Sequence, residues 1–177
     1  MDTPWPLRPA TPADASALSA LGRRTFLETF GGLYRETDQA GFLEGAYTPA
    51  LQRRELEDPA WLTLLAERDG EPVGFAQLIL GRDFPERPQP GPVELNRLYL
   101  LKATQGMGLG DALMKAALRA ARDAGGRTLW LGVWEHNDRA QAFYRRWGFT
   151  RVGEHLFRVG TQDDTDHILA RSLQDVP

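Results

Sequence analysis

The stretch Gln105-Gly106-Met107-Gly108-Leu109-Gly110 lies between a predicted strand and a predicted helix. Glycines let the backbone approach a ligand closely and turn its N–H groups toward that ligand. The start of the following helix adds unpaired N–H donors and a partial positive charge. The stretch therefore predicts a site for a pyrophosphate group. The alternative is a tight strand-to-helix turn that needs glycine only for its geometry.

Two other phosphate-binding patterns do not fit these residues. A Walker loop ends in Gly-Lys and then Ser or Thr, whereas the residue five positions after Gly106 is Asp111. A dinucleotide fingerprint, G-x-G-x-x-G, would need a glycine at position 111. A repeated βαβ sheet also has no room, because the chain after residue 149 is predicted to be β-rich.

The hydrophobic patterns on both sides of the glycines predict a mixed α/β chain. Val93 to Leu101 alternates as a strand, with Glu94, Asn96, Leu98 and Leu100 on one face. Apolar residues three and four apart, among them Leu109, Ala112, Leu113, Ala116, Ala117 and Ala120, predict a helix from about Gly108 to Ala124. The other expected strands are Trp5 to Arg8, Trp61 to Glu67, Pro72 to Leu80, Thr128 to Trp134, Phe149 to Val159 and His167 to Ser172. The other expected helices begin at Thr11, cover Pro49 to Glu57 and run from Asn137 to Trp147. Phe84 to Pro92, with four prolines in nine residues, is expected to be a loop, and Gly160 to Asp164 a turn.

Composition excludes several classes of protein. With 177 residues, 42 % hydrophobic and 25 % charged, the chain suits a single folded domain over residues 1–177. A net charge of −3 gives no basic surface for nucleic acid, and no apolar run is long enough to span a membrane. The absence of cysteine excludes an acyl-cysteine intermediate. It fits the cytoplasm, as does the lack of a signal-peptide pattern.

Two motifs together resemble the GNAT superfamily of N-acetyltransferases. Its cofactor motif, Arg/Gln-x-x-Gly-x-Gly/Ala, is matched by Gln105, Gly108 and Gly110. Asn137 is followed seven residues later by Tyr144, which is also typical of the family. A closer resemblance, to PaiA-type polyamine acetyltransferases, rests on residues 130–135, His155, Thr165-Asp166, Thr25-Phe26 and Thr29-Phe30.

The resemblance implies a fold and a cofactor. The expected fold is a twisted, mostly antiparallel sheet with one splayed parallel strand pair and helices on both faces. Acetyl-CoA would lie in the splay, and its acetyl group would pass to a small-molecule amine, such as spermidine or spermine. A homodimer is frequent in this family. The residues implied in cofactor binding are Leu98, Tyr99, Leu100, Gln105, Gly106, Met107, Gly108, Leu109, Gly110, Asp111, Asn137, Tyr144 and Arg146.

Two residues are candidates for the proton transfers of amide formation. A free amine is protonated at neutral pH, so a base or a water chain leading to one must remove a proton. Glu94 is the candidate base, with an exposed or salt-bridged carboxylate as the alternative. Tyr144 is the candidate acid for the leaving thiolate. Its alternative is a core tyrosine on the apolar helix face that also carries Phe143 and Trp147.

Phe30, Tyr34 and Trp134 are the candidates for the wall of an acceptor site, since aromatic rings suit a cation. His136, His155 and His167 show no metal-ligand spacing, so no metal is expected. Two hypotheses compete with the enzyme. One is a non-catalytic sensor that binds acetyl-CoA on the same fold, and the other is a nucleotide-binding protein of another kind.

Overall fold

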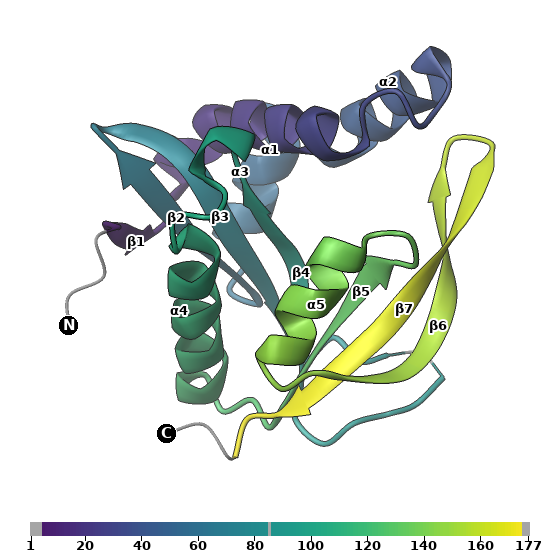
Figure 1. Ribbon diagram of the computed structural model, residues 1–177. Helices are drawn as coiled ribbons and strands as arrows, with labels where there is room; N and C mark the ends of the chain where they lie inside the picture. The colour runs from purple at the N-terminus through teal and green to yellow at the C-terminus, as the bar shows by residue number, and fades with distance from the viewer. Residues whose placement is uncertain (1–4, 85, 175–177) are drawn as a thin grey trace.

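The computed structural model describes residues 5–84 and 86–174, and its strands form one sheet in the order β1-β2-β3-β4-β5-β7-β6 (Figure 1). All neighbouring strands are antiparallel except β4 and β5, which confirms the expected mixed sheet. The strands are β1 (Leu7–Pro9), β2 (Trp61–Arg68), β3 (Glu71–Leu80), β4 (Pro92–Leu100), β5 (Thr128–Trp134), β6 (Thr150–Val159) and β7 (Gln162–Ser172). The helices are α1 (Ala15–Phe30), α2 (Glu36–Ala46), α3 (Pro49–Glu57), α4 (Leu109–Asp123) and α5 (Asp138–Arg146), with short 3-10 turns η1 (Pro12–Asp14) and η2 (Lys102–Thr104).

The sheet splits between β4 and β5. The two strands pair only at their beginnings, where residues 92–94 lie beside residues 128–130. Beyond that point β4 continues along β3 and β5 continues along β7, with no ladder between residues 95–100 and 131–134. The backbone groups that face the split are therefore free to bind a ligand.

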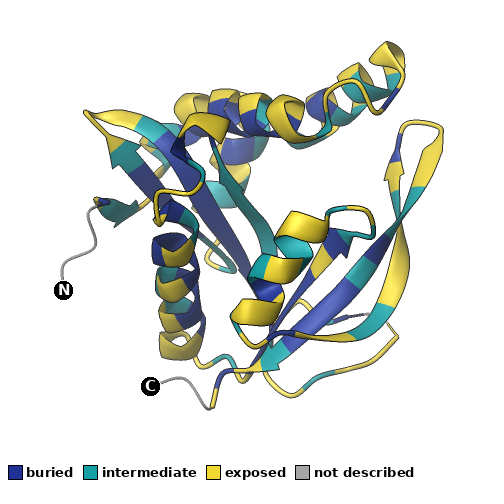
Figure 2. Ribbon diagram, in the orientation of Figure 1, coloured by how far each residue is buried: buried dark blue, intermediate teal, exposed yellow. Residues whose placement is uncertain are grey.

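Helices cover both faces of the sheet, as expected. α4 packs on β2, β3 and β4 from one side, and α1 and α3 pack on the same half of the sheet from the other. Figure 1 shows α4 and α5 on the near side, and Figure 2 shows the inner side of α4 and much of β3 in dark blue. None of the helices in the described part of the chain is long and apolar enough to cross a membrane.

The buried face of α4 is wider than the predicted stripe, because the helix packs across three strands. Ala116 and Ala120 are only partly buried. The fully covered residues are Leu109, Ala112, Leu113, Met114, Ala117, Leu118 and Ala121.

A β-bulge at Asn96 reverses the expected facing of β4. Leu95 lies opposite Leu78, but Arg97 lies opposite Gln77, so Asn96 is an extra residue. Residues directly opposite each other point to the same face of a sheet. After the bulge, even-numbered and odd-numbered positions therefore exchange faces.

The expectation that Glu94 shares a face with Leu98 and Leu100 is consequently wrong. Glu94 shares its face with Arg97 and Tyr99, on the side covered by α1 and α3. Leu98 and Leu100 point to the opposite side, where the Leu100 side chain lies close to Gly110 of α4.

A network beneath the bulge explains why it is stable. The side-chain oxygen of Gln77 accepts hydrogen bonds from Asn96 Nδ2 at 3.1 Å and from Arg97 at 2.6 Å. Arg97 also donates to Glu55 of α3 at 3.0 Å and lies over the ring of Tyr47. Each polar group gains a partner, so burial of this network costs little.

Three element boundaries differ from the sequence expectation. Helix α2 was not expected, because among its residues only Leu43 is buried and no apolar stripe marks it. The turn over residues 160–164 is shorter than expected, since β7 begins at Gln162 and its acidic start pairs with β6. β1 covers Leu7–Pro9, and the indole of Trp5 instead donates a hydrogen bond to the Met107 carbonyl.

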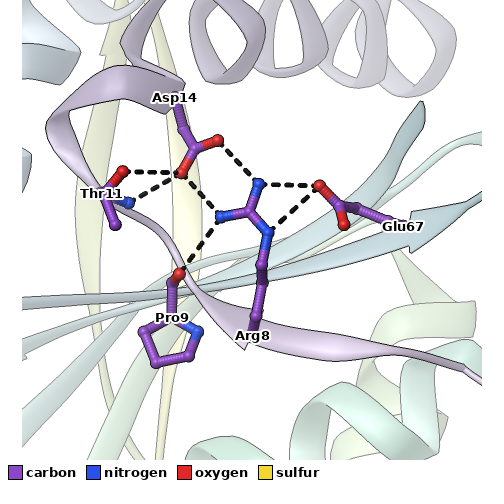
Figure 3. Close-up of polar contacts among 5 residues, drawn as sticks. All are labelled: Arg8, Pro9, Thr11, Asp14 and Glu67. Carbon is purple, nitrogen blue, oxygen red and sulfur yellow. Dashed lines mark hydrogen bonds and ion pairs between the residues drawn. The ribbon is translucent and has the colours of Figure 1, made fainter. Parts of the chain in front are cut away.

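An ion network anchors the beginning of the chain to the sheet (Figure 3). The Arg8 guanidinium donates to both carboxylate oxygens of Asp14 at 2.8 Å and to Glu67 at 2.7 Å. The Asp14 carboxylate also accepts from the backbone N–H of Thr11 at 2.8 Å. The hydrogen bonds from Arg8 lower the pKa of Asp14 to about 2. β1, η1 and β2 are thereby joined through one side chain.

Candidate active site

A cleft of about 560 Å³ occupies the split between β4 and β5 and is lined by residues from both faces of the sheet. We call its two sides the glycine-loop wall and the acidic wall. The glycine-loop wall consists of Gln105, Gly106, Gly108, Gly110, Asp111, Asn137, Arg139, Ala140, Phe143 and Tyr144. The acidic wall consists of Phe30, Tyr34, Glu94, Gly132, Trp134, His155, Phe157 and Asp166.

Two glycines of the glycine-loop wall have a backbone conformation that favours glycine, and a third lies close to α5. Gly106 and Gly108 have φ angles of 77° and 81°, a conformation that other residues adopt only with strain. Gly110 has an ordinary φ, but a Cβ there would lie 3.4 Å from the Phe143 ring. The loop therefore turns tightly at the start of α4, and α5 packs close against that start.

Most polar side chains of the glycine-loop wall already have partners. Arg139 donates to the Gln105 side chain at 2.6 Å, which joins α5 to the loop. Asn137 caps α5 as expected, because its side-chain oxygen accepts from the Ala140 N–H at 3.1 Å. Asp111 accepts hydrogen bonds from Arg146 and Trp147. The wall is thus rigid before any ligand arrives.

The structure brings most of the sequence-predicted site residues to the cleft, but not all of them. Met107 is exposed, Leu109 is buried in the core, and Arg146 pairs with Asp111 and lies over the Phe143 ring. These three do not line the cleft. The predicted residues that do line it are Phe30, Tyr34, Glu94, Leu98, Tyr99, Leu100, Gln105, Gly106, Gly108, Gly110, Asp111, Trp134, Asn137 and Tyr144.

Tyr144 enters the cleft from α5 with its hydroxyl free. The residue is 9 % exposed, and its ring packs edge-on against Phe143 and Phe149. Within the described ranges, no hydrogen bond engages its hydroxyl. Burial raises the pKa of Tyr144, and the nearby Tyr99 adds to the rise. The phenol is therefore protonated at neutral pH and able to donate a proton.

Glu94 lies at the closed end of the split. Its carboxylate accepts a hydrogen bond from Arg82 at 3.2 Å. Burial raises the pKa of Glu94, while the charges of Arg82 and Arg97 oppose that rise. Arg82 lies at the start of the proline-rich loop. The backbone carbonyl of Arg82 accepts a hydrogen bond from the Trp130 indole at 2.8 Å, which holds this end of the loop in place. The start of the loop that separates the two halves of the sequence is thus held beside Glu94 and Trp130.

Aromatic rings bridge α1 and α2 to the far half of the sheet. Phe30 meets Trp134 at 6.1 Å between ring centroids, and Phe42 of α2 meets Phe157 of β6 at 5.7 Å. The hydroxyl of Tyr34 donates to Asp164 of β7 at 2.6 Å. These contacts, between residues far apart in sequence, cover the cleft on its acidic side.

Sequence reasoning did not assign Asp166 to the site. It lies opposite Trp134 on β5 and opposite His155 on β6, so all three point to the face of Glu94. Burial, with the charge of Asp164, raises the pKa of Asp166 to about 6. Alternation of Asp164 and Asp166 along a strand was the available signal, but the turn expected at residues 160–164 obscured it. In the described part of the chain, no group of three or more acidic or histidine side chains is placed to hold a metal ion.

The fold and the site together define a class of protein. A sheet opened between two parallel strands, with a helix start ready for phosphate on one side and an acidic, aromatic wall on the other, is the architecture of an acyl-transfer enzyme. The Acetyltransferase (GNAT) family model matches residues 27–149, more than half of the chain. The chain belongs to this family and is an acyltransferase.

Two individual relatives agree with the family assignment, and a solved structure shares the fold. An N-acetyltransferase from Lactobacillus delbrueckii subsp. lactis is 36 % identical over 160 residues, 90 % of this chain and 92 % of the relative. An aminoglycoside N(6′)-acetyltransferase from Stenotrophomonas maltophilia is 32 % identical over 144 residues, 81 % of this chain and 84 % of the relative. The crystal structure of a PaiA N-acetyltransferase from Thermoplasma acidophilum, in complex with coenzyme A, has a TM-score of 0.77 at 21 % identity, covering 96 % and 99 % of the two chains.

Proposed function

We propose that this protein transfers the acetyl group of acetyl-CoA directly to a primary amine, with polyamines such as spermidine and spermine among its acceptors. The observation that carries the proposal is the cleft through the split sheet, because it joins an anion-binding helix start to a wall suited to cations. Acetyl-CoA supplies the activated acetyl group as a thioester.

The chain offers a fitting place for acetyl-CoA. Gly106 and Gly108 leave backbone N–H groups open at the start of α4, which suits a pyrophosphate. Past the bulge, β4 presents the unpaired backbone of Leu98 to Leu100 to the split, which suits the amides of the pantetheine arm. Asn137 keeps its side-chain nitrogen available, since its cap uses the oxygen.

The proposed reaction needs three proton transfers, two from the acceptor nitrogen and one to the leaving thiolate. Glu94, directly or through a water, accepts a proton from the acceptor ammonium, and the neutral amine nitrogen attacks the thioester carbonyl. A C–N bond forms and the C–S bond breaks. The hydroxyl of Tyr144 then donates its proton to the departing thiolate, which agrees with its protonated state in the cleft. The attacking nitrogen loses its second proton as the amide forms, and that proton returns to the Tyr144 phenolate through water. Two substrates held together in this way need no covalent acyl-enzyme.

The acceptor would lie along the acidic wall. Phe30, Tyr34 and Trp134 offer aromatic faces to a cation, and carboxylates lie on the same side. The aminoglycoside acetyltransferase relative is named for an acceptor that, like a polyamine, carries several ammonium groups. Both kinds of acceptor suit a wall of this chemistry.

The experiment that tests the proposal measures release of free CoA from acetyl-CoA with a panel of polyamines, aminoglycosides, small amines, amino acids and N-terminal peptides. We expect turnover with polycationic amines, and a Michaelis constant that is lowest for them. Tight binding of acetyl-CoA by calorimetry, with no CoA release for any amine, would overturn the proposal and favour a non-catalytic sensor.

The same proposal includes a single N-acetyltransferase domain over residues 1–177, a cytoplasmic location and a homodimer. The absence of cysteine supports the location. Light scattering after size exclusion tests the dimer, and a mass of one chain would contradict it.

A further inference from the structure

Asp166 carries a buried carboxylate without a partner. The residue is 9 % exposed and lines the cleft, and between residues 5–84 and 86–174 no hydrogen bond or ion pair reaches its oxygens. Burial of an unpaired charge costs free energy. A group of this kind calls for an explanation, and a bound ligand can supply the missing partner.

We propose that Asp166 is a specificity-determining residue whose carboxylate binds a second cationic group of the acceptor, remote from the amine that is acetylated. The inference rests on the proposed function, because it concerns the acceptor of that same reaction. Through Asp166, the enzyme would prefer acceptors with at least two amino groups.

The neighbours of Asp166 leave room for such a group. Gly132 lies next to it on the same face, and a Cβ there would lie 3.1 Å from the Asp166 oxygen and 3.2 Å from the His155 ring. Because position 132 has no side chain, the carboxylate is reached directly from the cleft. Opposite Asp166 on β5 stands Trp134, whose ring offers an aromatic face to the same cation.

The surrounding charges favour a cation. Asp164, two residues earlier on β7, is oriented by the hydroxyl of Tyr34 and adds a second negative charge. His155, across from Asp166 on β6, has its pKa lowered by burial and so carries no competing positive charge at neutral pH. No arginine or lysine of the described chain forms an ion pair with Asp166, in contrast to Glu94 and its partner Arg82.

The spacing separates this group from the reacting amine. Glu94 lies level with Trp130 of β5, and Asp166 lies level with Trp134. Four residues of strand correspond to about 13 Å between the two backbone levels. A linear diamine laid along this face reaches one carboxylate with each end, whereas a monoamine engages one of them.

The test compares linear α,ω-diamines with linear monoamines of matched chain length. The specificity constant kcat/KM is measured for both by CoA release, with wild-type protein and Asp166→Asn. We expect wild type to prefer diamines, and Asp166→Asn to lower the diamine-to-monoamine ratio by about 10- to 100-fold, mainly through KM. The matched control is Asp163→Asn, an exposed carboxylate on the same strand that pairs with Arg158 and should keep the wild-type ratio.

A second variant keeps the charge but fills the space. Gly132→Ala should also lower the diamine preference, because its methyl group crowds the carboxylate. An unchanged ratio in Asp166→Asn would overturn the inference. So would an equal loss of kcat for both kinds of amine, which would place Asp166 at the reacting nitrogen.

Binding separates a failure of this inference from a failure of the proposed function. If wild type releases no CoA with any amine, the proposed function fails. Calorimetry of a diamine with CoA present still tests the subsite. Asp166→Asn should then weaken diamine binding by about 10-fold or more. Equal affinities in wild type and variant would sink the subsite as well.

Discussion

The two walls of the cleft are built in opposite ways. The glycine-loop wall comes from two short stretches, residues 105–111 and 137–144, and most of its polar side chains already have hydrogen-bond partners. The acidic wall draws on α1, β4, β5, β6 and β7. Among the residues that the structure describes, neither the Asp166 carboxylate nor the Trp134 indole nitrogen has a hydrogen-bond partner. Most polar side chains of the first wall are held in place before a ligand arrives, whereas the second wall includes a carboxylate and an indole nitrogen that a ligand can satisfy.

This difference separates two tasks of one enzyme. A wall that holds the same cosubstrate in every cycle gains from being rigid and preorganised. A wall that recognises one acceptor among many gains from groups that are unsatisfied until the right acceptor binds. Substitutions in one wall and at matched residues elsewhere should therefore have different effects on binding and turnover.

The largest expected effect comes from Tyr144, where the two walls meet. Tyr144→Phe should lower kcat by about 10²-fold or more, because the thiolate loses its proton donor. The Kd for acetyl-CoA should change little. Stopped-time CoA release and calorimetry measure the two quantities. Tyr47→Phe, a buried tyrosine outside the cleft, is the control and should keep kcat within about twofold. Full activity in Tyr144→Phe would remove it as the acid.

Gly108→Ala tests the rigid wall. At a φ of 81° an alanine is strained, so the loop should open and acetyl-CoA should bind about tenfold more weakly. The matched control is Gly41→Ala in the exposed helix α2, where a Cβ meets nothing within 4 Å. That change should leave acetyl-CoA affinity alone and raise the melting temperature slightly. Equal affinities in both variants would contradict a cradle at Gly108.

Asp166→Asn should stabilise the ligand-free protein, because an unpaired buried carboxylate opposes folding. Its pKa is raised to about 6, so ionisation costs stability as pH rises from about 4 to about 6. Above pH 6 the variant should gain about 1 kcal/mol, a rise of about 2–4 °C in melting temperature, and below pH 4 the gain should vanish. Asp163→Asn should show no such gain. A destabilised Asp166→Asn would indicate a structural role for the carboxylate.

Asp14→Asn should change stability by a similar amount in the opposite direction. Its pKa is lowered to about 2 by Arg8, so its contribution to stability is present above about pH 4 and is lost as pH falls through about 2. Because Arg8 is 41 % exposed and therefore screened, Asp14→Asn should cost about 1 kcal/mol at pH 7. Urea unfolding at pH 7 and at about pH 2 measures the free energy of unfolding of wild type and variant. Asp123→Asn, at an exposed pair with Arg119, should cost less, and an equal loss would contradict the role of the network.

The fold was predictable wherever a local pattern settles an element. The stripe of α4, the cap at Asn137 and the alternation of β5 each lie in a few adjacent residues. Helix α2 was missed because it buries one leucine, and the bulge at Asn96 was missed because its cause lies in Gln77, Glu55 and Arg97, which tertiary structure brings together.

The site follows the same rule. The glycine-loop wall could be assigned because its residues follow one another in two motifs. Asp166 could not be assigned to the site, because its place in the cleft depends on its lying across from Trp134 and His155 in neighbouring strands. The contact of Arg82 with Glu94 was equally hidden, because the proline-rich stretch indicates a loop but not where that loop folds back.

The short seam between β4 and β5 has a mechanical consequence. Three residue pairs, from Pro92 with Thr128 to Glu94 with Trp130, join the two parts of the sheet along this edge. A molecule bound in the open part of the split contacts both β4 and β5. It therefore keeps the two strands apart and at the same time links them. Occupancy should therefore slow amide hydrogen exchange at the facing edges of both strands. A bound substrate would therefore contribute to the structural stability of the sheet for as long as it stays bound.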